Sequence, residues 1–172
     1  MTKYFLGLTE RKNQNPNGIN TDINTPAHQQ LAENLYANAI TLLKDDKNLL
    51  PLNQHATFYY VPLEEAPHET FQKTLMTNRN IITKKASEIS SIPPKSVVLI
   101  GLHKDNSTAY KPYKISDPSK KMIEKLSKKH HVILDLFGSP YALNDLRLDD
   151  ISTVVISYEN NDDSMKASVK AL

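Results

Sequence analysis

The chain has 172 residues, which predicts a single domain, and its 21 Lys and Arg nearly balance its 19 Asp and Glu, for a formal charge of +2. This balance does not favour a nucleic-acid binder, whose basic residues usually dominate one face. The chain has no cysteine, which excludes disulfides and thiolate metal sites. Its glycines are not clustered, which excludes glycine-rich phosphate loops and therefore the common nucleotide-cofactor motifs.

No apolar run approaches the roughly 20 residues needed to cross a bilayer, and we expect no membrane segment. The opening residues contain too short an apolar run for a signal peptide. The sequence leaves the compartment of the protein open, export or the periplasm included.

The first part of the chain is polar up to residue 24. Residues 9–24 are rich in asparagine and are broken by Pro16 and Gly18, which predicts a linker over residues 1–24. Thr25 and Pro26 are typical of a helix start. Apolar residues at helical spacing follow, so we expect a lead-in helix over residues 26–44 that is packed on more than one side. The residues on its apolar face are Leu31, Leu35, Ala39 and Leu42.

Short β-type runs then alternate with helical stretches. The helical stretches begin near Pro67, Asp117 and Asp162. Because several runs are apolar on both faces, the pattern predicts an α/β fold, a three-layer α/β/α sandwich with a mostly parallel five-stranded sheet. We expect it to span residues 25–172, with the flavodoxin-like strand order 2-1-3-4-5. The five runs cover residues 57–61, 80–83, 96–101, 131–137 and 152–157.

Most candidate chemical groups have an ordinary structural explanation. The six histidines show no metal-ligand spacing, and the paired aspartates stand at helix ends or in loops, where they favour the helix dipole. Ser139 follows Gly138 after a strand, but Pro140 occupies the place where the helix amides of a nucleophile elbow begin. We therefore expect neither a metal site nor a catalytic residue in this chain.

The loop over residues 102–116 is the strongest candidate for a functional segment. It leaves the carboxyl end of the third predicted strand, the edge at which open α/β sheets bind ligands. It is also long and rich in polar and aromatic side chains, as functional loops often are. A tolerated surface insertion remains the alternative explanation.

Four segments, in order along the chain, resemble glycoside hydrolase family 3. Residues 39–52, A-I-T-L-L-K-D-D-K-N-L-L-P-L, are similar to the entry to the second domain of that family. Residues 137–143, F-G-S-P-Y-A-L, resemble its G-N/S-P-Y-x-L turn, and Ser157-Tyr158 with the helix ending at Leu172 resembles a later segment. Residues 3–8 look like the stretch that closes the preceding barrel. The β-N-acetylglucosaminidase-type branch is the most similar.

The resemblance implies that the parent enzyme has an N-terminal TIM-like barrel, which carries the aspartate nucleophile and which this chain lacks. In the glucosidase branch a glutamate after the third strand of the second domain takes part in catalysis. The matching residues here, 101–105, contain no glutamate, which argues against that branch. We therefore expect a non-catalytic C-terminal domain, with the barrel as its partner and carbohydrate as the substrate of the intact enzyme.

The substrate-binding candidates follow from where the loop would lie in such an enzyme. Barrel active sites lie at the carboxyl ends of the barrel strands, so an interface between the two edges would place the loop beside the sugar. His103, Asp105, Asn106 and Tyr110 then offer hydrogen bonds or ring stacking.

Two other functions remain open. One is a free-standing flavodoxin-like binding or regulatory module; the other, less favoured, is an enzyme in its own right. Since the last helix runs to the final residue without a C-cap, we expect the chain to be a segment of a longer protein.

Overall fold

The computed structural model describes Tyr4, residues 16–108 and residues 110–172. The chain divides into two compact units, one up to Leu31 and one from Ala32. In the first unit, Gly18 adopts a left-handed backbone conformation and precedes the short helix α2 (Ile19–Ile23). The predicted linker over residues 1–24 and the barrel-like residues 3–8 lie mostly outside the described residues. No helix among the described residues has the length and apolarity to span a membrane.

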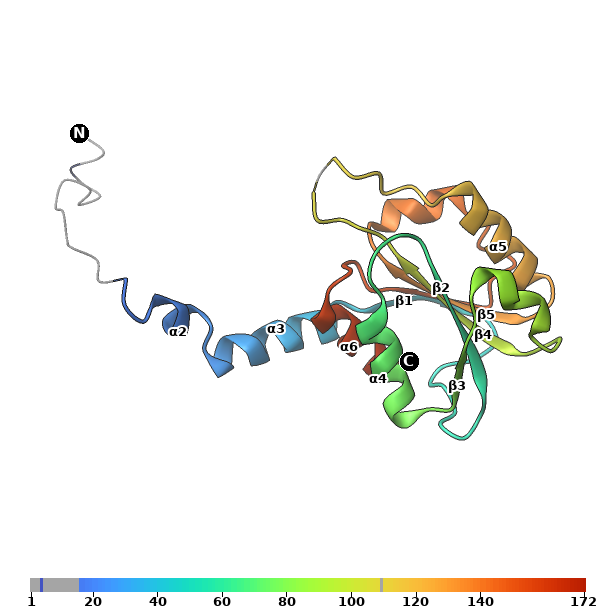
Figure 1. The fold of residues 1–172 in the computed structure, drawn as a ribbon, viewed down its shortest axis with the longest axis horizontal. Helices are drawn as coiled ribbons and strands as arrows, with labels where there is room; N and C mark the ends of the chain where they lie inside the picture. The colour runs from blue at the N-terminus through green and yellow to red at the C-terminus, as the bar shows by residue number, and fades with distance from the viewer. Residues whose placement is uncertain (1–3, 5–15, 109) are drawn as a thin grey trace. The chain divides into compact units, whose positions relative to one another are not determined.

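The second unit is built on a six-stranded sheet in the order β1-β6-β5-β4-β2-β3 (Figure 1). Five strands, β2 to β6, are parallel, and β1 pairs antiparallel with β6 at one edge. The strands are β1 (Thr41–Asp45), β2 (Phe58–Leu63), β3 (Ile81–Thr83), β4 (Val97–His103), β5 (His131–Phe137) and β6 (Thr153–Ile156).

The predicted α/β class is confirmed. The five predicted runs correspond to β2 to β6. When they are numbered 1 to 5 along the chain, their spatial order in the sheet is the predicted 2-1-3-4-5. The predicted number of strands was one too low. Residues 41–45 form the edge strand β1, where we expected the end of a helix. Helix α3 (Pro26–Ala39) stops before this segment. The Asp45 carboxylate, which accepts hydrogen bonds from the amides of Leu49 and Leu50 and from the Thr153 hydroxyl, holds the strand on the sheet.

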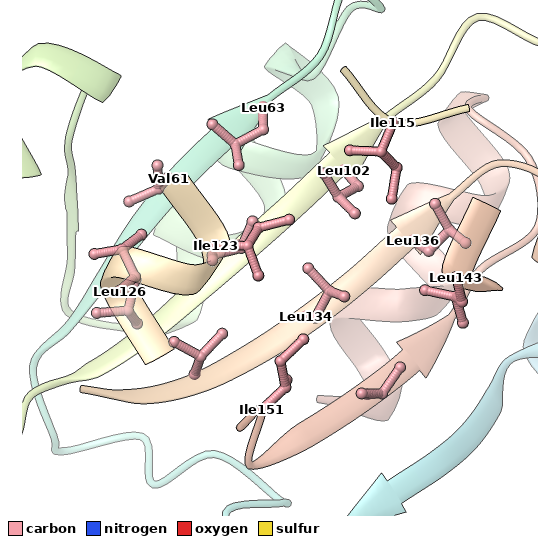
Figure 2. Packing of buried hydrophobic residues seen from close by; sticks show 14 of the residues in the cluster. Val61, Leu63, Leu102, Ile115, Ile123, Leu126, Leu134, Leu136, Leu143 and Ile151 are labelled. Atoms are coloured by element: carbon pink, nitrogen blue, oxygen red, sulfur yellow. The ribbon is translucent and has the colours of Figure 1, made fainter. Parts of the chain in front are cut away.

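Helices cover both faces of the sheet, which confirms the three-layer arrangement. On one face, Ile123 and Leu126 of α5 (Asp117–Ser127) pack against strand residues such as Leu134 (Figure 2). The 3₁₀ helices η1 (Ala86–Ser91) and η2 (Pro140–Asp145) add side chains to the same cluster. On the other face, α4 (Glu69–Asn78) and α6 (Asp162–Ala171) contribute Phe71, Leu75 and Met165 to a second cluster.

The lead-in helix does not pack as predicted. Helix α3 has no buried residue, and Leu35 and Leu42 keep 63% and 53% of their surface exposed. The expectation that the helix is packed on more than one side is therefore wrong for this chain. Helical spacing shows that leucines share a face, but it does not show that anything covers that face.

Candidate functional site at the carboxyl edge of the sheet

The carboxyl ends of the parallel strands bring several polar residues to one edge. Glu64 directly follows β2, Lys104 follows β4, and Tyr158 comes two residues after β6. Glu64 and Tyr158 have positive φ angles of 75° and 61°, a region that non-glycine residues rarely adopt. Such backbone strain concentrates at functional sites. The edge therefore combines the ligand-binding position of an open α/β sheet with an unusual local backbone.

A buried ion pair lies at the centre of this edge. The Lys104 ammonium is 3.0 Å from Oε2 of Glu64 and 2.9 Å from Oε2 of Glu65. The side chains of Lys104 and Glu64 are 6% and 3% exposed, whereas that of Glu65 is 51% exposed. Gly138 makes this packing possible, since a Cβ atom there would lie 2.9 Å from the Cβ of Lys104.

Glu64 also holds the start of helix α5. Its Oε1 accepts hydrogen bonds of 3.0 Å from the Ser116 amide and 2.9 Å from the Ser116 hydroxyl. Burial raises the pKa of the Glu64 carboxyl, but hydrogen bonds from Ser119, Lys104 and Ser116 outweigh it and leave the pKa below its ordinary value. Glu64 is thus a charged structural residue that fixes the end of the loop. The surrounding concavity has a volume of about 610 Å³ and is also lined by Glu65, Lys111 and Lys114.

Two of the predicted site residues, Asp105 and Asn106, lie together beside this ion pair. The Asp105 carboxylate pairs with the Lys111 ammonium, and this bond, with those from Ser107, lowers the carboxyl pKa. The Asn106 amide donates a 3.3 Å hydrogen bond to the Tyr158 carbonyl. Both side chains line a concavity of about 220 Å³ together with Lys104, Thr108, Lys111, Tyr113 and Ser139.

His103 lies beneath the edge rather than at its surface, and its side chain is completely buried. Its Nε2 is 2.9 Å from the Tyr60 hydroxyl, and its Nδ1 is 2.7 Å from Oδ1 of Asn160. The ring stacks on Phe137 at a centroid distance of 4.6 Å. Burial lowers the pKa of His103 to about 4, so the imidazole is neutral near pH 7. His103 connects β4 to the loop before α6 and has no direct path to a ligand in this structure.

The fourth predicted residue, Tyr110, is 97% exposed. The structure thus places Asp105 and Asn106 together, His103 in the core and Tyr110 in solvent. Sequence reasoning missed Glu64, Glu65 and Lys104. A signal for the two glutamates was present, since they follow an apolar strand directly and therefore had to reach the same edge.

The described residues offer no cluster of three or more histidine, cysteine or carboxylate side chains arranged to hold a metal ion. What the edge presents is a set of hydrogen-bonding groups, namely carboxylates, amides, hydroxyls and lysine ammonium groups, with the exposed rings of Tyr110 and Tyr113 nearby in the sequence. Such a surface can bind a polar ligand through hydrogen bonds.

Comparison with known proteins gave results for structure only. No family model and no curated protein matches the sequence. Among solved structures, β-glucoside phosphorylase BglX with bound 2FGlc matches 98% of this chain with a TM-score of 0.76 and 19% identity. A glycoside hydrolase family 3 β-N-acetylglucosaminidase from Paenibacillus sp. matches 97% with a TM-score of 0.61, also at 19% identity. A β-glucosidase from Listeria innocua in complex with gluconolactone matches 98% with a TM-score of 0.72 at 13% identity.

In each case this chain spans only part of the matching chain, namely 33%, 34% and 28% of its length. A fungal multi-domain GH3 β-N-acetylglucosaminidase matches 89% of this chain over 18% of its own, with a TM-score of 0.66. The fold is thus that of one portion of considerably longer carbohydrate-active proteins. The resemblance first indicated by the ordered motifs is confirmed in structure: this chain has the α/β fold found in one portion of glycoside hydrolase family 3 proteins.

Proposed function

We propose that this chain is the non-catalytic C-terminal domain of a glycoside hydrolase, a β-N-acetylglucosaminidase. In this proposal it packs on an N-terminal TIM-like barrel and borders the sugar-binding site with its carboxyl edge. The observation that carries the proposal is the match of nearly the whole chain to about a third of longer proteins that act on β-glycosides. The order of the four family-like segments supports the same assignment.

Exposed leucines support packing against a further domain. Leu42 and Leu43 of β1 keep 53% and 52% of their surface exposed, and Leu35 of α3 keeps 63%. Burying one such side chain contributes about 1.5–3 kcal/mol, so a partner that covers these residues would gain substantial stability. An unpaired edge strand with exposed leucines is costly to leave bare.

At the carboxyl edge, Asp105, Asn106 and Tyr110 are the proposed sugar-contacting residues. Carboxylate and amide groups hydrogen-bond sugar hydroxyls, and an exposed tyrosine ring offers a stacking surface. His103 would act indirectly, by holding Asn160 and Tyr60. No catalytic residue is assigned to this chain, because retaining glycosidases need two suitably spaced carboxyl groups across the sugar, and the family-like nucleophile belongs to the barrel.

The test is to assay this chain alone and together with a barrel polypeptide from the same reading frame, using aryl N-acetyl-β-glucosaminide and aryl β-glucoside. We expect no turnover by the chain alone and turnover of the N-acetylated substrate by the combination. A reading frame that encodes no barrel, or turnover by this chain alone that a point change within it abolishes, would contradict the proposal. Preference for the β-glucoside would refute the N-acetylglucosaminidase assignment only.

Single alanine variants of Asp105, Asn106 and Tyr110 in the combined enzyme test the edge. We expect each to lower kcat/KM by about 10-fold, the effect of losing one good contact at about 1.4 kcal/mol. Lys170→Ala, at an exposed position of helix α6, is the control and should leave kcat/KM unchanged. Wild-type kcat/KM in all three edge variants would show that the loop is a surface insertion.

A further inference from the structure

The amino ends of the parallel strands, opposite the carboxyl edge, carry a cluster of basic residues. Four loops meet there, because the amino ends of β4, β5 and β6 lie at the same edge as the end of the antiparallel strand β1. They surround a concavity of about 280 Å³. The basic cluster, as we call it, consists of Lys47, Lys95, Lys128, Lys129, His130 and His131, and the concavity is also lined by Ser127, Asp150 and Ser152.

The net charge of the whole chain does not reveal how much positive charge this cluster carries. The four lysines of the basic cluster, together with Asp150 in the wall of the concavity, carry a formal charge of +3, whereas the whole chain carries +2. All four lysines are exposed. Lys128 pairs with Glu124 at 2.6 Å, but within the described part of the chain no ion pair joins Lys47, Lys95 or Lys129 to a carboxylate. Uncompensated lysines on neighbouring loops repel one another unless an anion lies between them.

The backbone holds the basic loops in fixed positions. The Lys95 amide donates a 2.9 Å hydrogen bond to the Lys129 carbonyl, and the His131 amide donates a 3.0 Å bond to the Ser96 carbonyl. Lys95 itself has a φ of 62°, in the left-handed region that a lysine rarely adopts. A 3.0 Å bond from the Asp46 amide to the Ser152 carbonyl anchors the loop that carries Lys47. These backbone hydrogen bonds therefore preorganise the loops that carry the lysines.

A second, independent observation lies in the wall of the same concavity. His130 is 92% buried, and its Nδ1 is the one buried side-chain polar atom of the described residues that lacks a hydrogen-bond partner. Buried polar atoms are nearly always paired, and an exception commonly marks a missing water or ion. Burial lowers the pKa of His130, and a hydrogen bond with the Pro93 backbone opposes this effect only in part, so the lysines supply the positive charge of the cluster.

We propose that the basic cluster is a second carbohydrate-binding site, which binds the carboxylate or other oxyanion groups of an acidic polysaccharide. Lysine ammonium groups suit dispersed oxyanions, and several lysines on adjacent loops suit a chain that repeats its charge. The choice of a carbohydrate rests on the proposed function, while the site itself rests on the geometry. Seven-residue strands separate the two edges by about 20 Å, at about 3.3 Å per residue. A polymer bound here would therefore hold the enzyme near its substrate without blocking the sugar site.

The test is calorimetry at pH 7 with the whole protein chain. Three ligands are compared, namely a polygalacturonate oligomer of about six residues, inorganic tripolyphosphate and a twelve-residue oligothymidylate. We expect the polyuronate to bind at 50 mM NaCl. Its affinity should fall about 50-fold by 200 mM NaCl, the dependence expected for about four ionic contacts to a flexible polyanion.

The variant Lys95→Gln/Lys129→Gln should weaken polyuronate binding at least 10-fold. The matched control Lys73→Gln/Lys170→Gln removes the same charge from exposed positions of α4 and α6 and should bind like the wild type. Equal losses of affinity in both double variants would show that binding depends only on the net charge of the protein, and would overturn the site. Tighter binding of the oligothymidylate would overturn the carbohydrate assignment, and tighter binding of tripolyphosphate would overturn it in favour of a site for small phosphates. Failure of the barrel experiment would not alter these binding results, so the two proposals fail separately.

Discussion

The Lys104 ammonium lies 3.0 Å from the Glu64 carboxylate, and both side chains are almost completely buried. The pair joins the carboxyl end of β4 to that of β2, and through Ser116 it also joins both strands to the start of α5. The polar edge of the sheet is therefore held by charge at its centre as well as by the apolar cluster beneath it.

Replacing Lys104 with methionine should destabilise the domain by about 3–5 kcal/mol, because Glu64 would remain buried without its counter-charge. The measurement is the free energy of unfolding in urea. Adding Glu64→Gln to this variant should recover more than half of the loss, since no buried charge then remains. Equal stability of the wild type and Lys104→Met would show that the ion pair does not hold the edge.

Asp135, in the middle of β5, should make stability depend on pH. Its carboxyl is completely buried between the hydroxyls of Ser157 and Ser168, and burial raises its pKa to about 7. The unfolded carboxyl has a pKa of about 3.9. The folded state therefore binds the proton more tightly, and this contribution, up to about 4 kcal/mol, is present below pH 4 and lost as the pH rises to 7.

The measurement for Asp135 is a series of urea unfolding curves between pH 4 and pH 8, compared with Asp135→Asn. The amide is neutral at every pH, so the variant should gain stability relative to the wild type as the pH rises. Titration of the buried histidines is common to both proteins and cancels in the comparison. A constant stability difference across this range would contradict the raised pKa of Asp135.

Truncation of the lead-in leucines should have little effect in this chain. We expect Leu35→Ala and Leu42→Ala each to change the free energy of unfolding by no more than about 0.5 kcal/mol, because both side chains are largely exposed. Leu134→Ala, in the buried core, is the comparison and should cost about 2–5 kcal/mol. A loss of that size at Leu35 would show that α3 is covered in solution. In an enzyme that includes the barrel, the same two variants should become destabilising.

Gly101 is required by the buried histidine next to it. A Cβ atom at this position would lie 2.5 Å from Nε2 of His103 and 3.1 Å from a ring carbon of Tyr60. We expect Gly101→Ala to displace the His103 ring and cost about 1–3 kcal/mol through overpacking. The readout is thermal unfolding together with the NMR shifts of the His103 ring. Unchanged histidine shifts would mean that the backbone moves instead.

The sequence by itself determined the class of the fold, whereas the order of the parallel strands was chosen among the few topologies that right-handed crossovers allow. Runs such as residues 131–137 are apolar on both faces, and only a sheet covered on both sides can bury them. It also located the carboxyl edge, because the loop after β4 had to leave the sheet there. Asp105 and Asn106 follow from that position alone.

Tertiary structure decided the features that depend on partners distant in sequence. Residues 41–45 became a strand because β6 was available to pair with them, although their pattern is compatible with a helix. His103 is the last residue of β4 and lies only two residues before Asp105, yet it points into the core, where Tyr60 and Asn160 offer it hydrogen bonds. The basic cluster could not be predicted for the same reason: Lys47, Lys95 and Lys129 are far apart in the chain, and only the pairing of the strands in the sheet brings their loops together. Local pattern records which side chains share a face, whereas burial and charge depend on what the rest of the chain places against it.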